Sequence, residues 1–201
     1  MGIDPSPTVI QQARKLTRPD ECELMEASVY NLPFEDKSFH HCHTHQVLQH
    51  LESPVQAIIE MKRVAKELVV CTDVDYETWI TYPHFDGIEK WKSAYRQQCR
   101  RNLTDPDCGR RLKSLYLQAG FHPDALRMSG STVTYSSPNE VHEISTQWAD
   151  RIEQTSLGEQ LREVHGRDAV ETMIHDWRKW GQEPDAILFY VNIHVIGKIH
   201  M

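Results

Sequence analysis

The stretch Gly2-Ile3-Asp4-Pro5-Ser6-Pro7 joins a short apolar segment to the start of a helix. Ser6 is a good cap residue because its hydroxyl can accept from an early backbone N–H, and proline is favoured at the first helical position. Apolar residues then follow at helical spacing, at Val9, Ile10, Ala13 and Leu16. The stretch therefore predicts a helix that begins at Pro7.

The same helix-start signature recurs at Ser53-Pro54, Asp105-Pro106 and Ser137-Pro138. Gln56 and Glu140 add the spacing of a capping box to the first and last of these starts. Gly120 and Gly181 stand where a left-handed residue would end a helix.

Short runs rich in β-branched residues lie between these helices and predict strands. They are Cys22–Ala27, part of Ser38–Val47, Glu67–Thr72, Ala125–Tyr135 and Ala186–Ile199. The alternation of helix and strand predicts an α/β fold with parallel strands, and the last run suits an antiparallel addition to the sheet.

The composition is that of an ordinary globular protein: 201 residues, 39% hydrophobic, with a net charge of −7. This length suggests one domain over residues 1–201, since domains average roughly 150 residues. The acidic balance disfavours nucleic acid and anionic membranes as partners. The sequence shows no apolar run of membrane-spanning length and no signal-peptide pattern, so we expect a cytoplasmic protein with its five cysteines reduced.

Four blocks of sequence occur in a characteristic order and spacing. They are Gly2–Ser6, Ser28–Phe39, Gln46–Leu51 and Glu60–Val64. Together they resemble class I S-adenosylmethionine-dependent methyltransferases, most closely the quinone-biosynthesis type and its natural-product relatives. The resemblance implies a Rossmann-like sheet with helices on both faces, S-adenosyl-L-methionine as cofactor, and a small-molecule substrate in a secondary-metabolite or quinone-type pathway.

The resemblance assigns cofactor contacts to three residues near the N-terminus. Asp4 would accept hydrogen bonds from the ribose hydroxyls, and Ser28 and Val29 would border the adenine edge. Each has a simpler interpretation. Asp4 also suits a role in support of the Ser6 cap, and Ser28 and Val29 suit a plain turn from strand to loop.

Histidines are concentrated after Phe39. His41, His43 and His45 share one face of the predicted strand, and His50 follows shortly after. Residues in one strand rarely converge on a tetrahedral metal, so we predict no metal site. The resemblance places His45 and His50 on the substrate side, where either is a candidate general base; a purely structural hydrogen-bonded histidine is the alternative for each.

Residues 76–104 form an aromatic-rich stretch after the strand that ends near Asp73. An insertion at the carboxyl end of a strand suits a substrate lid for a planar molecule. Because Ile88, Trp91 and Tyr95 have helical spacing, the alternative is an ordinary packed core.

The family's first strand and glycine-rich loop, expected before Gly2, do not occur in the sequence, and Lys66-Glu67 replaces its usual Pro-Gly-Gly turn. We expect an N-terminally truncated form with weak activity or none. Loss of the first strand would separate the strand at Cys22–Ala27 from the strand after Phe39 and leave two unpaired sheet edges, which another copy or a protein partner would cover. The alternatives are a noncatalytic remnant that acts as a binding or scaffold protein, and catalysis of another reaction.

Overall fold

The computed structural model describes residues 1–18 and 22–199. The strands are β1 (Gly2–Asp4), β2 (Leu24–Glu26), β3 (Phe39–His45), β4 (Ala65–Tyr82), β5 (Leu126–Tyr135) and β6 (Ile187–Lys198). The α-helices are α1 (Pro7–Leu16), α2 (Pro54–Val64), α3 (Asp86–Arg101), α4 (Cys108–Gln118), α5 (Pro138–Gln154), α6 (Ser156–His165) and α7 (Arg167–Trp180). Two short 3-10 helices, η1 (Leu48–His50) and η2 (Pro123–Ala125), precede α2 and β5.

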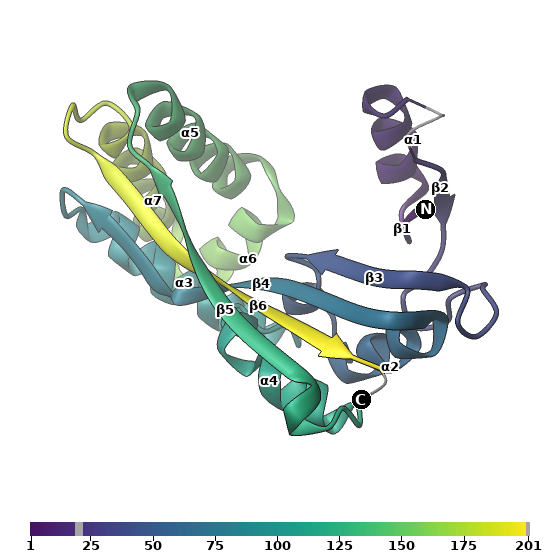
Figure 1. The fold of residues 1–201 in the computed structure, drawn as a ribbon. Coiled ribbons are helices and arrows are strands. Elements are labelled where there is room, and N and C mark those ends of the chain that lie inside the picture. Colours follow the sequence, from purple (N-terminus) through teal and green to yellow (C-terminus); the bar gives the residue numbers. More distant parts are fainter. Residues whose placement is uncertain (19–21, 200–201) are drawn as a thin grey trace.

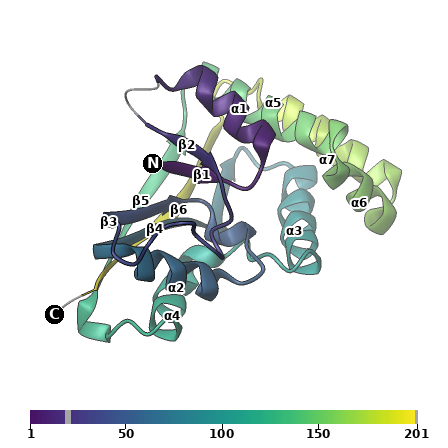
Figure 2. The same ribbon diagram turned by 90° about the vertical axis from the view of Figure 1, so that its right-hand side faces the viewer.

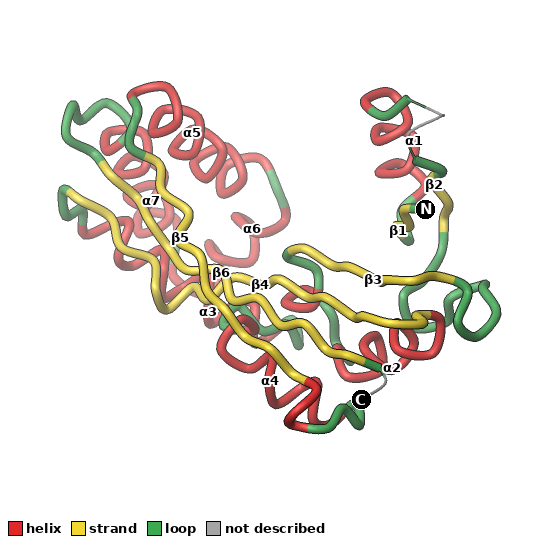
Figure 3. The backbone as a smooth tube through the Cα atoms, in the orientation of Figure 1, coloured by secondary structure: helices red, strands yellow, loops and turns green. Residues whose placement is uncertain are grey.

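Within the described residues, these strands form two separate sheets. β1 pairs in parallel with β2, and a four-stranded sheet has the order β3-β4-β6-β5. β3 is parallel to β4, whereas β6 is antiparallel to both of its neighbours. Figures 1, 2 and 3 show β1, β2 and α1 standing apart from the four-stranded sheet, on the side of β3. The predicted separation of the strand near Cys22 from the strand after Phe39 is therefore confirmed, as is the antiparallel last strand.

Two apolar cores pack against the four-stranded sheet. The first joins α3, α5, α6 and α7 to the ends of β4 and β6 around Trp91, Trp148 and Trp177. The second joins α2 and α4 to the first half of β4 around Leu112 and Tyr116. In the described part of the chain, α1, β1 and β2 contribute no residue to either core. None of the described helices is long and apolar enough to cross a membrane.

β4 is much longer than the predicted strand Glu67–Thr72, and it follows α2 without a loop. Its pairing with β6 shifts register between Asp75 and Ile80. Thr78 spans this bulge, because its hydroxyl donates to the Asp75 carbonyl at 2.6 Å and accepts from the Val191 N–H at 2.9 Å. A bulge redirects the side chains next to it, here those of Tyr76–Trp79.

Three of the four predicted helix starts are confirmed, at Pro7, Pro54 and Pro138. The start predicted at Asp105-Pro106 is displaced: α4 begins at Cys108. The cause is a turn, in which the Cys108 N–H donates to the Asp105 carbonyl and the Asp105 side chain accepts from the Asp107 N–H at 3.1 Å.

The predicted caps differ in outcome. Ser137 and Glu140 form a complete capping box, whereas the Ser53 side chain makes no capping hydrogen bond. Gly120 has the left-handed conformation expected, with φ +78°. For Gly181 the expectation is wrong: its φ of −63° is right-handed, so no glycine is needed there for backbone reasons.

We expect Ser137→Ala to lower the free energy of unfolding by about 1 kcal/mol, because it removes the acceptor for an orphan N–H at the start of α5. The Ser137 hydroxyl accepts from the Glu140 N–H at 3.4 Å, and a Glu140 carboxylate oxygen accepts from the Ser137 N–H at 3.0 Å. Urea denaturation should show the loss. Ser136→Ala, which leaves the box intact, is the matched control; equal losses in both variants would contradict the capping role.

Candidate functional site

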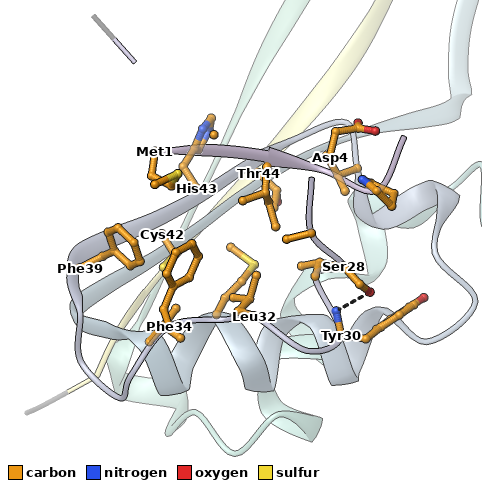
Figure 4. A pocket seen from close by; sticks show the side chains of 18 of the residues that line it. Met1, Asp4, Ser28, Tyr30, Leu32, Phe34, Phe39, Cys42, His43 and Thr44 are labelled. Atoms are coloured by element: carbon orange, nitrogen blue, oxygen red, sulfur yellow. Dashed lines mark hydrogen bonds between the residues drawn. The ribbon is translucent and has the colours of Figure 1, made fainter. Parts of the chain in front are cut away.

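A cavity of about 480 Å³, which we call cavity 1, is lined by residues from both β1 and β3. Asp4, Ser28, Val29 and His45 all line it, so four of the five predicted site residues are brought together. In Figure 4, β1 and β3 run in the same direction past this cavity. The rest of the lining is mainly apolar and includes Ile3, Tyr30, Leu32, Phe34, Phe39, Cys42, Val47, Leu51, Met61 and Val64.

Asp4 is the last residue of β1 and is half-buried. Its Oδ1 accepts from the Ser6 N–H at 2.8 Å, and the Ser6 hydroxyl in turn accepts from the Val9 N–H at 3.4 Å. The capping role suggested for Asp4 is therefore present. Its second oxygen, Oδ2, has no hydrogen-bond partner among residues 1–18 and 22–199, so it can accept from a hydroxyl group. Figure 4 shows this carboxylate above the strand, away from Leu32 and Phe34.

Ser28 and Val29 follow β2 in a turn at the edge of cavity 1. The Ser28 hydroxyl accepts from the Tyr30 N–H at 3.3 Å, shown by the dashed line in Figure 4. The Ser28 carbonyl accepts from the Asn31 N–H at 3.2 Å. The turn interpretation is thus correct as local structure, and the contact with adenine stays a prediction.

The β3 histidines differ in their surroundings. The His41 imidazole pairs with Glu67 at 3.3 Å. Partial burial and the neighbouring His45 lower the pKa of His43. The described residues contain no group of three histidine, cysteine, aspartate or glutamate side chains placed to hold a metal ion.

The chain turns sharply between β3 and η1, and this turn is anchored from β4. Gln46 has a positive φ of 53° and its N–H donates to the Thr72 carbonyl at 2.7 Å. Asp73 accepts from the Leu48 and Gln49 N–H groups, each at 3.2 Å, and is 0% exposed. Burial raises the pKa of Asp73 to about 7. Asp73 therefore fixes the short helix that carries His50.

A second cavity, of about 260 Å³, lies on the other side of this turn, and we call it cavity 2. His50 lines cavity 2, so the structure separates it from the other predicted site residues. Burial and the charge of Arg151 lower the pKa of His50, which keeps its imidazole neutral at pH 7. The lining comprises Gln46, Gln49, His50, Tyr76, Trp79, Tyr135, Ile144, Gln147, Trp148, Arg151 and Tyr190.

The aromatic stretch 76–104 is divided between this cavity and the core. Trp79 lines cavity 2. Ile88, Trp91 and Tyr95 lie in the first apolar core, as the packed-core alternative predicted. The stretch forms the end of β4 and α3, and its role as a lid stays a prediction.

Several residues of cavity 2 were not predicted from the sequence. Trp148 had the spacing of a core residue on a helix, and nothing local marked Arg151 or Tyr190 as its neighbours. The three-residue spacing of Trp148 and Arg151, which places both side chains on one helix face, was the available signal.

Several of the known proteins that this chain resembles are described as methyltransferases. Residues 1–71 match the family model described as a methyltransferase domain. An uncharacterised methyltransferase of Schizosaccharomyces pombe is 26% identical over 98% of this chain and 75% of its own length. A solved structure from Bacillus halodurans, described as a methyltransferase, has 15% identity and a TM-score of 0.59, and the match covers 99% of this chain and 82% of that one.

A second similar structure was solved as a complex with bound small molecules. It is a phosphoethanolamine N-methyltransferase of Haemonchus contortus in complex with phosphomonomethylethanolamine and S-adenosylhomocysteine. Its identity is 17% and its TM-score 0.52, with 98% of this chain and 42% of that chain covered. The chain therefore has the Rossmann-like class I methyltransferase fold, and its residues 1–71 are similar to a methyltransferase domain.

The residues around cavity 1 fit the nucleoside half of that cofactor. Asp4 has a free carboxylate oxygen there, and the apolar floor suits a purine ring. The fit does not extend to the amino-acid half, because the described lining residues include a single glycine and neither lysine nor arginine. That glycine, Gly2, serves packing: a Cβ there would lie 2.9 Å from a methyl carbon of Leu24.

Proposed function

We propose that this chain is an S-adenosylmethionine-dependent methyltransferase that acts on a small molecule of a quinone-type or secondary-metabolite pathway. One observation carries the proposal: His45 lines cavity 1 and the next residue, Gln46, lines cavity 2. A nucleoside site and a substrate site then lie back to back at the carboxyl end of β3, where α/β sheets bind ligands.

In this proposal the cofactor is held by its nucleoside. Asp4 accepts from the ribose hydroxyls through Oδ2, while Ser6 fixes the other carboxylate oxygen. Ser28 and Val29 border the adenine. When bound, the cofactor supplies an activated methyl group on a sulfonium. The contribution of the chain is alignment, since the turn Gln46–His50 is held rigidly by Thr72 and Asp73 between the two cavities.

His50 is the better candidate for a general base. Its pKa is lowered, so at pH 7 the imidazole has a free lone pair, and it lines the cavity assigned to the substrate. The His50 ring makes no hydrogen bond with another described residue, which argues against a purely structural role. His45 lines cavity 1 and is the alternative base at its border.

We expect calorimetric titration with S-adenosylmethionine to show weak binding, with a Kd of about 100 µM or above, because the residues of cavity 1 fit only the nucleoside half of the cofactor. Asp4→Ala should abolish this binding. Asp4→Asn should weaken it by about tenfold, since the amide can still accept from the Ser6 N–H but has lost its charge.

Asp124→Ala is the matched control, because its carboxylate is 82% exposed and lies outside both cavities. The control should bind as the unmodified chain does. Tight binding that survives Asp4→Ala would refute the assignment of the nucleoside site. Because cavity 1 fits only the nucleoside half of the cofactor, adenosine should compete for this site nearly as well as the whole cofactor does.

A further inference from the structure

Cavity 2 has rigid aromatic walls. Trp79 stacks between Tyr76 and Tyr190, with ring centroids 4.8 and 5.0 Å away and interplanar angles of 12° and 13°. Trp148 stands at 81° to Trp79 with a centroid distance of 5.7 Å. Stacked and perpendicular rings of this kind hold one another in place, and their edges give cavity 2 an aromatic lining.

The cation of cavity 2 has no counterion. The Arg151 guanidinium lies 5.1 Å from the Trp148 ring centroid and 5.8 Å from that of Tyr95. Arg96 and Arg110 pair with buried carboxylates, whereas Arg151 forms no ion pair or side-chain hydrogen bond with any residue in the described part of the chain. None of the described residues that line cavity 2 is acidic. Cation–π contacts hold the guanidinium in place while its N–H donors stay available.

The polar side chains that line cavity 2 are mostly uncharged. Among the described residues they are Gln46, Gln49, His50, Tyr76, Tyr135, Gln147, Arg151 and Tyr190, of which Arg151 is the fully charged one. The charge of Arg151 also reaches the interior of the cavity, where it helps to lower the pKa of His50.

We propose that cavity 2 binds a planar aromatic acid, with its ring against the aromatic lining of the cavity and its carboxylate paired with Arg151. Guanidinium and carboxylate form strong, often bidentate hydrogen bonds. A neutral or cationic aromatic molecule would leave Arg151 without a counterion. This inference rests on the proposed function, because it identifies the class of small molecule that the methyltransferase would accept.

The test measures binding in the absence of cofactor, by ligand-observed NMR at low salt. The probes are 4-hydroxybenzoate, its neutral methyl ester, and 4-hydroxycyclohexanecarboxylate. We expect the aromatic acid to bind at least about tenfold more tightly than either of the other two. Arg151→Gln should reduce binding of the acid to the level of the ester and leave the ester within about twofold.

Arg101→Gln is the matched control, because it changes the net charge equally at an exposed position outside cavity 2. It should keep the preference for the acid. Equal binding of acid and ester, a preference that survives Arg151→Gln, or no binding of any probe would overturn the proposal. Since no cofactor is present, a failed titration with S-adenosylmethionine would refute the proposed function and leave this result unaffected.

Discussion

Asp73→Asn should make the free energy of unfolding much less dependent on pH. Asp73 is fully buried, and burial raises its pKa from the ordinary 3.8 to about 7. The folded chain therefore holds a proton on this carboxyl that the unfolded chain releases. Its contribution to stability is fully present below the unfolded pKa and is lost as the pH rises through the folded pKa.

The expected size follows from the pKa difference. Between pH 5 and pH 8, ionisation of Asp73 should remove about 3 kcal/mol from the free energy of unfolding. Asparagine cannot ionise, so its variant lacks this loss. Its free energy of unfolding is instead lowered by a roughly constant amount at every pH. The reason is that one amide oxygen replaces the two carboxylate oxygens that accept from the Leu48 and Gln49 N–H groups.

Urea denaturation at several pH values would measure this effect. The informative quantity is the difference in free energy between the unmodified chain and Asp73→Asn, since histidines also titrate in this range. Asp124→Asn, at an exposed carboxylate, should track the unmodified chain. Parallel curves for Asp73→Asn and the unmodified chain would contradict a raised pKa at Asp73.

Gly109→Ala should lower the free energy of unfolding by about 3 kcal/mol. Gly109 lies on α4 where the helix meets β4, and a Cβ there would lie 2.7 Å from the Asp73 carbonyl oxygen and 3.0 Å from that of Val74. Both atoms belong to the backbone of a central strand and cannot turn aside. The helix would have to move away, which loosens the packing of Leu112 and Tyr116.

Gly130→Ala provides the comparison for this prediction. Gly130 lies in β5, and the nearest atom to a Cβ there is 3.5 Å away, which is ordinary contact. We expect a change below about 1 kcal/mol at Gly130. If urea denaturation gave similar losses in the free energy of unfolding for the two substitutions, the close approach of α4 to β4 would not explain the effect at Gly109.

Local signals account for the parts of the fold that were predicted. The cap at Ser137 depends on residues within one turn, so it is visible in the sequence. The length of β4, in contrast, is not predictable from local sequence. Asp73 and Asp75 look like the end of a strand until their distant partners are known. Asp73 is satisfied by N–H groups of η1, and Asp75 by Arg110 at 2.6 Å.

The candidate site likewise has a part that was predictable from the sequence and a part that was not. Asp4, Ser28 and Val29 come from one strand–helix–strand unit, so the resemblance could place them together. Cavity 2 draws Tyr76 from a bulge in β4 and Arg151 from α5. Residues so far apart in the chain carry no joint signal in a single sequence.

The separation of β1 and β2 from the main sheet has a consequence for ligand affinity. A sheet of two short strands is only marginally stable by itself, and this one contributes to neither apolar core. Asp4 is carried on that small unit, opposite β3 across cavity 1. Whenever the unit leaves its position, the observed affinity falls in proportion to the fraction of competent molecules. In the proposed function, nucleoside binding therefore depends on the position of β1 as well as on the Asp4 carboxylate.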